Sequence, residues 1–196
     1  MAKERNATLS SEDAGDFFRL FLPLLDYVNQ AYEVSDVLGD QIRMGHPNLM
    51  ELKKVAAVLW GDHDIIDEYI AECQEQFGLD EADQKLLEGW KHPVTGKFLV
   101  ERHLSRGSIF IDPETEKVYL VKGLIDTWKE MLHDAPLPIL MNATLLPFRG
   151  SIISDGLVGV YRVSFGPGYR EGFRQIYMQA KQDGAILTAF PSKDTE

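Results

Sequence analysis

The heptapeptide RGSIFID at residues 106–112 returns 43 residues later as RGSIISD at residues 149–155. Each copy begins with an Arg-Gly pair, which is typical of a turn, and continues with isoleucines, which favour a strand. Each ends on an aspartate, Asp112 or Asp155, which is typical of the turn that follows a strand. The repeat therefore predicts the same strand-and-turn unit twice in one chain.

The match extends beyond the heptapeptide, because Gly123 and Gly166 stand at the same offset, each before a helical spacing of apolar residues. With one residue inserted, TLLP at 144–147 aligns with TAFP at 188–191. We therefore expect two tandem ββαβ units, residues 106–148 and 149–191, related by a pseudo-twofold axis. Neither unit covers its own apolar face, so the two are expected to form a mixed sheet or a small barrel.

The fold class that follows is α+β, with a helical region at residues 1–92, a β-rich domain at residues 93–191 and a tail at residues 192–196. Helical spacing marks the first region, where Asn48 and Asp80 are expected to cap helices and Pro23 to kink or split the first one. In the β-rich domain we expect strands at 97–104, 108–112, 117–122, 136–146, 151–154, 157–165 and 185–190, and helices at 123–132 and 169–183. Asp155-Gly156 predicts a hairpin, and the second helix is expected to turn Tyr169, Phe173, Ile176, Tyr177 and Ala180 inward.

Charge separates the two regions. The whole chain of 196 residues has a formal net charge of −11. Residues 1–92 hold 8 basic and 19 acidic residues, whereas residues 93–196 hold 12 of each. The acidic helical region is thus not expected to bind nucleic acid, because its field repels phosphates. The neutral region leaves its arginines available to an anion.

Ten of the 19 acidic residues of the helical region lie between Asp62 and Glu88. Three interpretations remain open for this run. It forms a solvated outer face, or it docks a basic protein partner, or it holds a metal ion through Asp62, His63 and Asp67. His63 and Asp67 share one helix face, as two ligands of one ion would. No cofactor motif is present, and the one cysteine, Cys73, excludes an internal disulfide.

Two arginine-containing groups are candidate binding sites in the β-rich domain. Gly166, Gly168, Arg170 and Arg174 join a strand to a helix, where backbone N–H groups and guanidinium groups could hold an anion. The alternative is an ordinary turn followed by a helix.

The second group is the repeated set Arg106, Arg149, Asp112 and Asp155, which would form a groove across the pseudo-twofold axis or simply mark equivalent turns. The sequence does not support a serine nucleophile, because the Gly-x-Ser-x-Gly motif is absent, although a histidine base could come from elsewhere in the fold. The sequence therefore leaves open whether the protein is an enzyme, and it identifies no catalytic residue.

Neither a signal peptide nor an apolar run of about 20 residues is found, so we expect a cytoplasmic protein without a membrane partner. The leading functional hypothesis is a non-enzymatic binding or regulatory module for a protein or peptide. The alternative is an enzyme or small-ligand binder with an anionic ligand at Gly166–Arg174. The oligomeric state is left open.

The segment LLPFRGSIISDGL at residues 145–157 resembles one shared by a group of uncharacterised bacterial proteins with a similar Leu-Pro-Phe, Gly, Ile-Ile and Asp-Gly-Leu pattern. In that group, as here, a Phe-Gly pair (Phe165-Gly166) and a tyrosine-containing helix follow. The resemblance covers residues 95 to 190. It implies a bacterial cytosolic protein and brings no catalytic residue with it.

Overall fold

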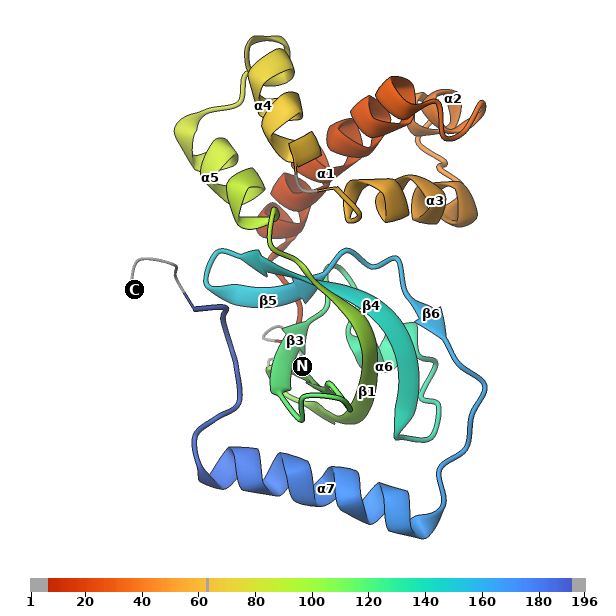
Figure 1. Ribbon diagram of the computed structural model, residues 1–196, viewed down its shortest axis with the longest axis vertical. Helices are drawn as coiled ribbons and strands as arrows, with labels where there is room; N and C mark the ends of the chain where they lie inside the picture. Colours follow the sequence, from red (N-terminus) through yellow and green to blue (C-terminus); the bar gives the residue numbers. More distant parts are fainter. Residues whose placement is uncertain (1–6, 63, 192–196) are drawn as a thin grey trace. The chain divides into compact units, whose positions relative to one another are not determined.

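The computed structural model describes residues 7–62 and 64–191, and the α+β class is confirmed. The chain divides into a helical unit, Glu12–Pro93, and a barrel unit, which combines Val94–Glu196 with Met1–Ser11. The tail at 192–196 lies outside the described residues. Figure 1 shows the element order of both units.

The described residues of the helical unit form five helices: α1 (Ser11–Tyr32), α2 (Leu38–Arg43), α3 (Leu49–Leu59), α4 (Asp64–Phe77) and α5 (Glu81–Gly89). Asn48 and Asp80 are the expected N-caps, since their side chains accept from the amides of Met50 and Asp83 at 2.8 Å. Pro23 lies inside α1, which is not split. Leu20, Leu24 and Leu25 are fully buried. Their packing offsets the loss of the backbone hydrogen bond that Pro23 cannot donate.

One ion pair lies at the edge of this core. Arg19 of α1 donates two hydrogen bonds, 2.9 and 2.6 Å, to the carboxylate of Asp83 in α5. The Asp83 side chain is only 8% exposed, whereas that of Arg19 is 48% exposed. The guanidinium therefore satisfies a buried carboxylate while it stays partly hydrated itself.

Within residues 7–11 and 94–191, the barrel unit contains six strands, two helices and an N-terminal extension. Its elements are β1 (Val94–Leu104), β2 (Gly107–Ile111), β3 (Val118–Lys122), α6 (Trp128–Met131), β4 (Ile139–Phe148), β5 (Ser151–Ser154), β6 (Gly159–Val160) and α7 (Pro167–Gln182). Residues 7–9 of the extension lie against Gly123, whose amide donates to Ala7 O at 2.9 Å. A Cβ on Gly123 would lie 1.9 Å from Asp126 O, so only glycine fits there.

Five of the strands close on themselves. β1 pairs antiparallel with both β2 and β4, β4 pairs with β5, and β5 returns to β3 in parallel. A register shift between Val100 and Arg102 lets one long strand serve both neighbours. The order β1-β2-β3-β5-β4, with a short helix between β3 and β4, is the topology of the OB-fold barrel.

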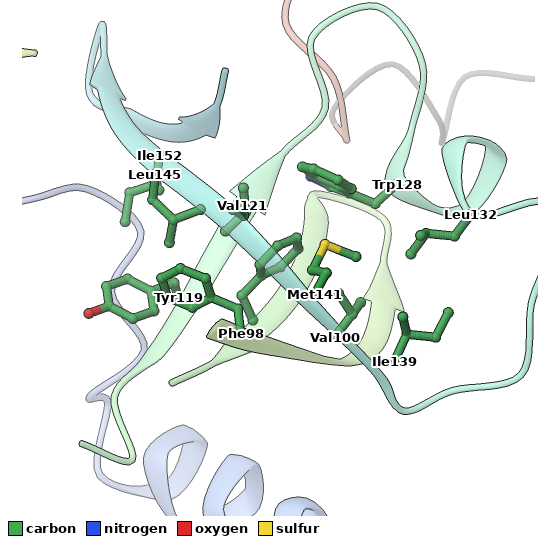
Figure 2. Packing of buried hydrophobic residues seen from close by; sticks show 12 residues of the cluster. Phe98, Val100, Tyr119, Val121, Trp128, Leu132, Ile139, Met141, Leu145 and Ile152 are labelled. Atoms are coloured by element: carbon green, nitrogen blue, oxygen red, sulfur yellow. The ribbon is translucent and has the colours of Figure 1, made fainter. Parts of the chain in front are cut away.

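The barrel interior is the larger of its two cores. Inward residues of five strands meet Trp128 of α6, whose ring lies 4.9 Å from that of Phe110. Figure 2 shows Phe98, Tyr119 and Met141 directed into this interior from three strands. The alternate residues of β2 and β3 face outward and are equally apolar, so this side of the sheet needs a cover.

Helix α7 provides that cover. Phe173, Ile176 and Tyr177 pack on a second core formed by the outer residues Leu99, Ile109, Ile111, Val118 and Leu120. The face of strands 2 and 3 that binds ligands in many OB-folds is therefore occupied by the chain itself. Figure 1 shows α7 along one side of the barrel, joined by two stretches without regular secondary structure.

Three expectations about the second repeat were wrong. β5 and β6 do not form a hairpin, because β6 pairs with β4 instead. The expected strand at 185–190 is a single bridge between Leu187 and Tyr119. Tyr169 is 70% exposed rather than inward, because Phe165 takes the place against Phe173, with ring centroids 5.4 Å apart. The first-repeat helix is also shorter than expected and begins at Trp128.

Candidate functional site

The first turns of α7 carry an apolar groove of about 330 Å³, called the α7 groove below. It is lined by Gly168, Tyr169, Gly172, Phe173 and Ile176. The helix starts at Pro167, whose fixed φ favours a first helical position, after the N-cap Gly166. The fold thus builds the groove beside the contact between α7 and the barrel, because Phe173 and Ile176 line the groove and also pack on the second core.

Aromatic rings form one wall of the α7 groove. Tyr169 lies 6.4 Å from Phe173 with nearly parallel rings and 6.4 Å from Phe165. Four of the six large apolar side chains that the described barrel unit exposes lie between residues 160 and 178: Val160, Val163, Tyr169 and Met178. Exposed apolar surface in the barrel unit is therefore concentrated on α7 and the segment before it, as at interaction sites.

The other wall is glycine. A Cβ placed on Gly168 or Gly172 would meet nothing within 4 Å, and neither residue has a positive φ. The fold therefore gives no steric reason for glycine at either position. Gly172 is interior to the helix, where glycine costs about 0.5–1 kcal/mol relative to alanine.

A second groove of about 380 Å³ lies on the opposite flank of α7. It brings together Arg170 and Arg174 from the predicted anion site, but Glu101 and Glu171 line it as well. Arg170 donates through Nε to Phe165 O at 2.9 Å, and Arg174 lies 3.8 Å from Glu171. Of the predicted glycines, Gly168 lines the other groove and Gly166 caps the helix, so the four residues do not converge on one anion.

The four repeated residues are also separated. Arg106 lines a cavity that Gly150 shares, whereas Arg149 lies over the ring of Phe148 at 5.4 Å. Asp112 holds the β2–β3 turn by accepting from Thr115 Oγ1 at 2.6 Å. Asp155 is 5% exposed and accepts from the amide of Leu157 at 3.0 Å. Both aspartates fix turns, and neither reaches the cavity beside Arg106.

The acidic run is exposed along α4 and α5 apart from Asp83. Asp62 accepts from the amide of Asp64 at 3.1 Å, and Asp67 pairs with Lys91. His63 lies outside the described residues, and those residues contain no group of three metal-ligating side chains. Cys73 is buried, and burial raises the pKa of its thiol, as expected for a cysteine that packs as a small apolar residue.

One pair was missed by sequence reasoning. His103 Nδ1 and Ser108 Oγ lie 2.7 Å apart across β1 and β2, where the two residues are register partners. Ser108 is 3% exposed and lines none of the grooves above, so the pair lacks access to a substrate. Burial, with a smaller contribution from Lys129, lowers the pKa of His103. The five-residue spacing around a hairpin turn was the available signal.

Comparison of the chain with protein-family models, curated proteins and solved structures finds no match. Within the described residues, no helix combines the length and apolar character that a membrane crossing requires. The function must therefore be argued from the grooves themselves.

Proposed function

We propose that the barrel unit is a non-enzymatic protein-recognition module that docks a partner helix in the α7 groove. The observation that carries the proposal is the open space beside Gly168 and Gly172. An alanine at position 172 would stabilise α7 and meet no atom of its own fold. Glycine at this position leaves room for an external backbone to approach the helix closely.

We infer a helical occupant because one face of α7 carries small or uncharged polar residues along its length. Gly168, Gly172, Gln175, Gln179 and Gln182 follow each other at intervals of 4, 3, 4 and 3. This is the spacing at which one helix presents a seam to another. Small residues at the first two positions bring the helix axes close, and Tyr169 and Met178 flank the seam with exposed apolar surface.

These five residues of α7, called the seam below, also define the chemistry of the partner. None of the five is charged, and the cations Arg170 and Arg174 line the groove on the other flank of α7. The matching surface is therefore an uncharged helix face with small and apolar side chains. Binding to it should depend little on salt, unlike docking of a basic partner on the acidic helices.

The test is site-specific photocrosslinking in the host cell, with a photoreactive phenylalanine analogue at Tyr169 and, as control, at Lys117 in the exposed β2–β3 turn. We expect a discrete protein adduct from position 169 alone, mapped by mass spectrometry to a helix with an uncharged face. When the crosslinking is repeated in a cell extract, the yield should be equal at about 0.1 M and about 1 M salt, a change that shortens the Debye length from about 10 to about 3 Å. Absence of an adduct, adducts shared by both positions, or a highly charged crosslinked segment would refute the proposal.

We also infer that residues 106–148 and 149–191 descend from one duplicated ββαβ unit with an original pseudo-twofold relation. The repeated heptapeptide supports this, as does the order β2, β3, α6 in one segment and β5, β6, α7 in the other. The second copy diverged where β6 moved to the edge of β4. Superposition of β2 on β5 and of α6 on α7 in an experimental structure tests the inference, and the lack of any common superposition of these two pairs would contradict it.

A further inference from the structure

A cavity of about 220 Å³, the turn pocket, lies where three connections of the barrel meet. Arg106 comes from the β1–β2 turn, Lys122 from the end of β3, and Gly150 with Ser151 from the β4–β5 turn. Leu120 and Thr188 complete the lining. The pocket shares no residue with the α7 groove.

Backbone geometry places the two cations together. Gly107 has φ +144°, and a Cβ there would lie 2.6 Å from Val121 O, so only glycine lets the Arg106 turn close on β3. Lys122 follows Leu120 by two residues on β3, and both side chains therefore leave the same face of the strand. The parallel pairing of Lys122 with Ile153 brings β5, and with it Ser151, beside them.

The β4–β5 turn is equally constrained. Arg149 and Gly150 form a two-residue turn with φ +45° and +73° between the paired residues Phe148 and Ser151. Positive φ at both positions is typical of a tight hairpin turn. The turn pocket is thus built from rigid connections on three sides.

The charges in the turn pocket are uncompensated. No carboxylate lines it, and within residues 7–62 and 64–191 neither Arg106 nor Lys122 makes an ion pair. By contrast, Arg19 is paired with Asp83 and Arg102 with Glu101. Two like charges at one pocket repel each other, and an anion between them would relieve that repulsion.

We propose that the turn pocket binds a phosphate group, either as inorganic phosphate or on a small phosphomonoester. The planar guanidinium of Arg106 suits two phosphate oxygens at once, and the ammonium of Lys122 adds a point charge. The hydroxyl groups of Ser151 and Thr188, both in the lining, supply further donors. A carboxylate offers two oxygens to this set, whereas a phosphate offers three or more and engages every side of the pocket.

The experiment is calorimetric titration of the full chain with inorganic phosphate, glycerol phosphate and acetate at constant ionic strength. The variants are Arg106→Gln and Lys122→Gln, and the matched control is Arg162→Gln, an exposed arginine outside the pocket. We expect saturable binding of at least one of the two phosphate compounds, weaker binding of acetate, and unchanged affinity in the control. Each pocket variant should weaken phosphate binding by about tenfold or more, as loss of a charged hydrogen-bond partner does.

Tighter binding of glycerol phosphate than of inorganic phosphate would assign the pocket to a phosphomonoester, and the reverse order would assign it to the free ion. The proposal is overturned if neither compound binds saturably, or if both pocket variants bind like wild type. Circular dichroism of each variant confirms that the fold is retained. None of these outcomes bears on the α7 groove, so the two proposals succeed or fail separately.

Discussion

Helices α1 and α7 are both amphipathic, yet the protein uses them differently. Eight of the 22 residues of α1 are buried, including Phe17 and Phe21 against Trp90. In α7 only Tyr177 of 16 residues is buried, and an apolar groove stays open on the flank. The apolar face of α1 therefore serves folding, whereas part of the apolar surface of α7 stays exposed to solvent, as at interaction sites.

The largest expected difference in the free energy of unfolding comes from the same substitution, Phe to Ala, made once in each helix. Phe21→Ala in α1 should lower the free energy of unfolding of the helical unit by about 4 kcal/mol, because the side chain is 2% exposed. Phe173→Ala in α7 should cost about 1–2 kcal/mol, because that side chain is only partly buried. Amide hydrogen exchange in each unit measures both values. Equal losses would remove the distinction between the helices.

The next effect concerns how α1 is fixed to α5. Asp83→Asn removes the charge that Arg19 pairs with, and we expect a loss of about 2 kcal/mol of stability. The control is Asp40→Asn, which removes an exposed pair with Arg43 and should cost less than about 0.5 kcal/mol. Urea unfolding compares the two variants. A loss at Asp40 as large as that at Asp83 would contradict the role given to burial.

A smaller effect is expected in the barrel as pH falls. The folded pKa of His103 lies below the ordinary 6.5, so between these values the unfolded chain binds a proton that the folded barrel does not. Barrel stability should therefore fall as pH drops below about 6.5.

His103→Asn keeps a polar group near Ser108 without a titrating ring, and it should flatten this part of the pH profile. His133→Asn, at an exposed position with positive φ, is the control and should leave the profile as in wild type. Hydrogen exchange of the β1 and β2 amides, followed from pH 7.5 to 5, records the profile. A His103→Asn profile as steep as that of wild type would show that another group titrates.

Much of the helical unit could be predicted from sequence because its signals are local. Asn48 and Asp80 cap helices by accepting hydrogen bonds from amides within three residues of themselves. The buried residues of α4, Ile65, Ile66, Tyr69 and Cys73, recur at helical spacing within one helix. The prediction that Pro23 splits the first helix was wrong, because the buried residues around it hold α1 together. Short-range chemistry was enough here.

The barrel was less predictable because its decisive contacts are distant. Val100 and Ile139 pair across 39 residues, and the register shift after Val100 has no local signature. The same limit applied to the sites. The repeat singled out Arg106 as a candidate together with Arg149, Asp112 and Asp155, but it is the parallel pairing of β3 with β5 that brings Lys122 and Ser151 beside Arg106. For α7, helical periodicity placed Tyr169 inward because it takes no account of Phe165.

The smallest expected change in stability is that of Gly172→Ala, and it tests directly whether the fold requires this glycine. Gly172→Ala should stabilise the barrel unit by about 0.5–1 kcal/mol, because alanine is the better helix former and its Cβ meets no atom within 4 Å. Thermal unfolding at fixed protein concentration measures the gain, and Gly150→Ala, at φ +73°, is the control that should destabilise. A loss of stability at Gly172 would mean that the fold itself requires this glycine.

We propose that α7 keeps Gly168 and Gly172 for the close approach of a partner helix. The most direct measurement is the crosslinking yield from position 169 in the double variant Gly168→Ala/Gly172→Ala, relative to the same probe in an otherwise wild-type chain. We expect the double variant to be at least as stable as the wild-type chain and to give a strongly reduced crosslinking yield. The two added methyl groups prevent close approach of the helix axes. An undiminished yield from the double variant would contradict the proposal.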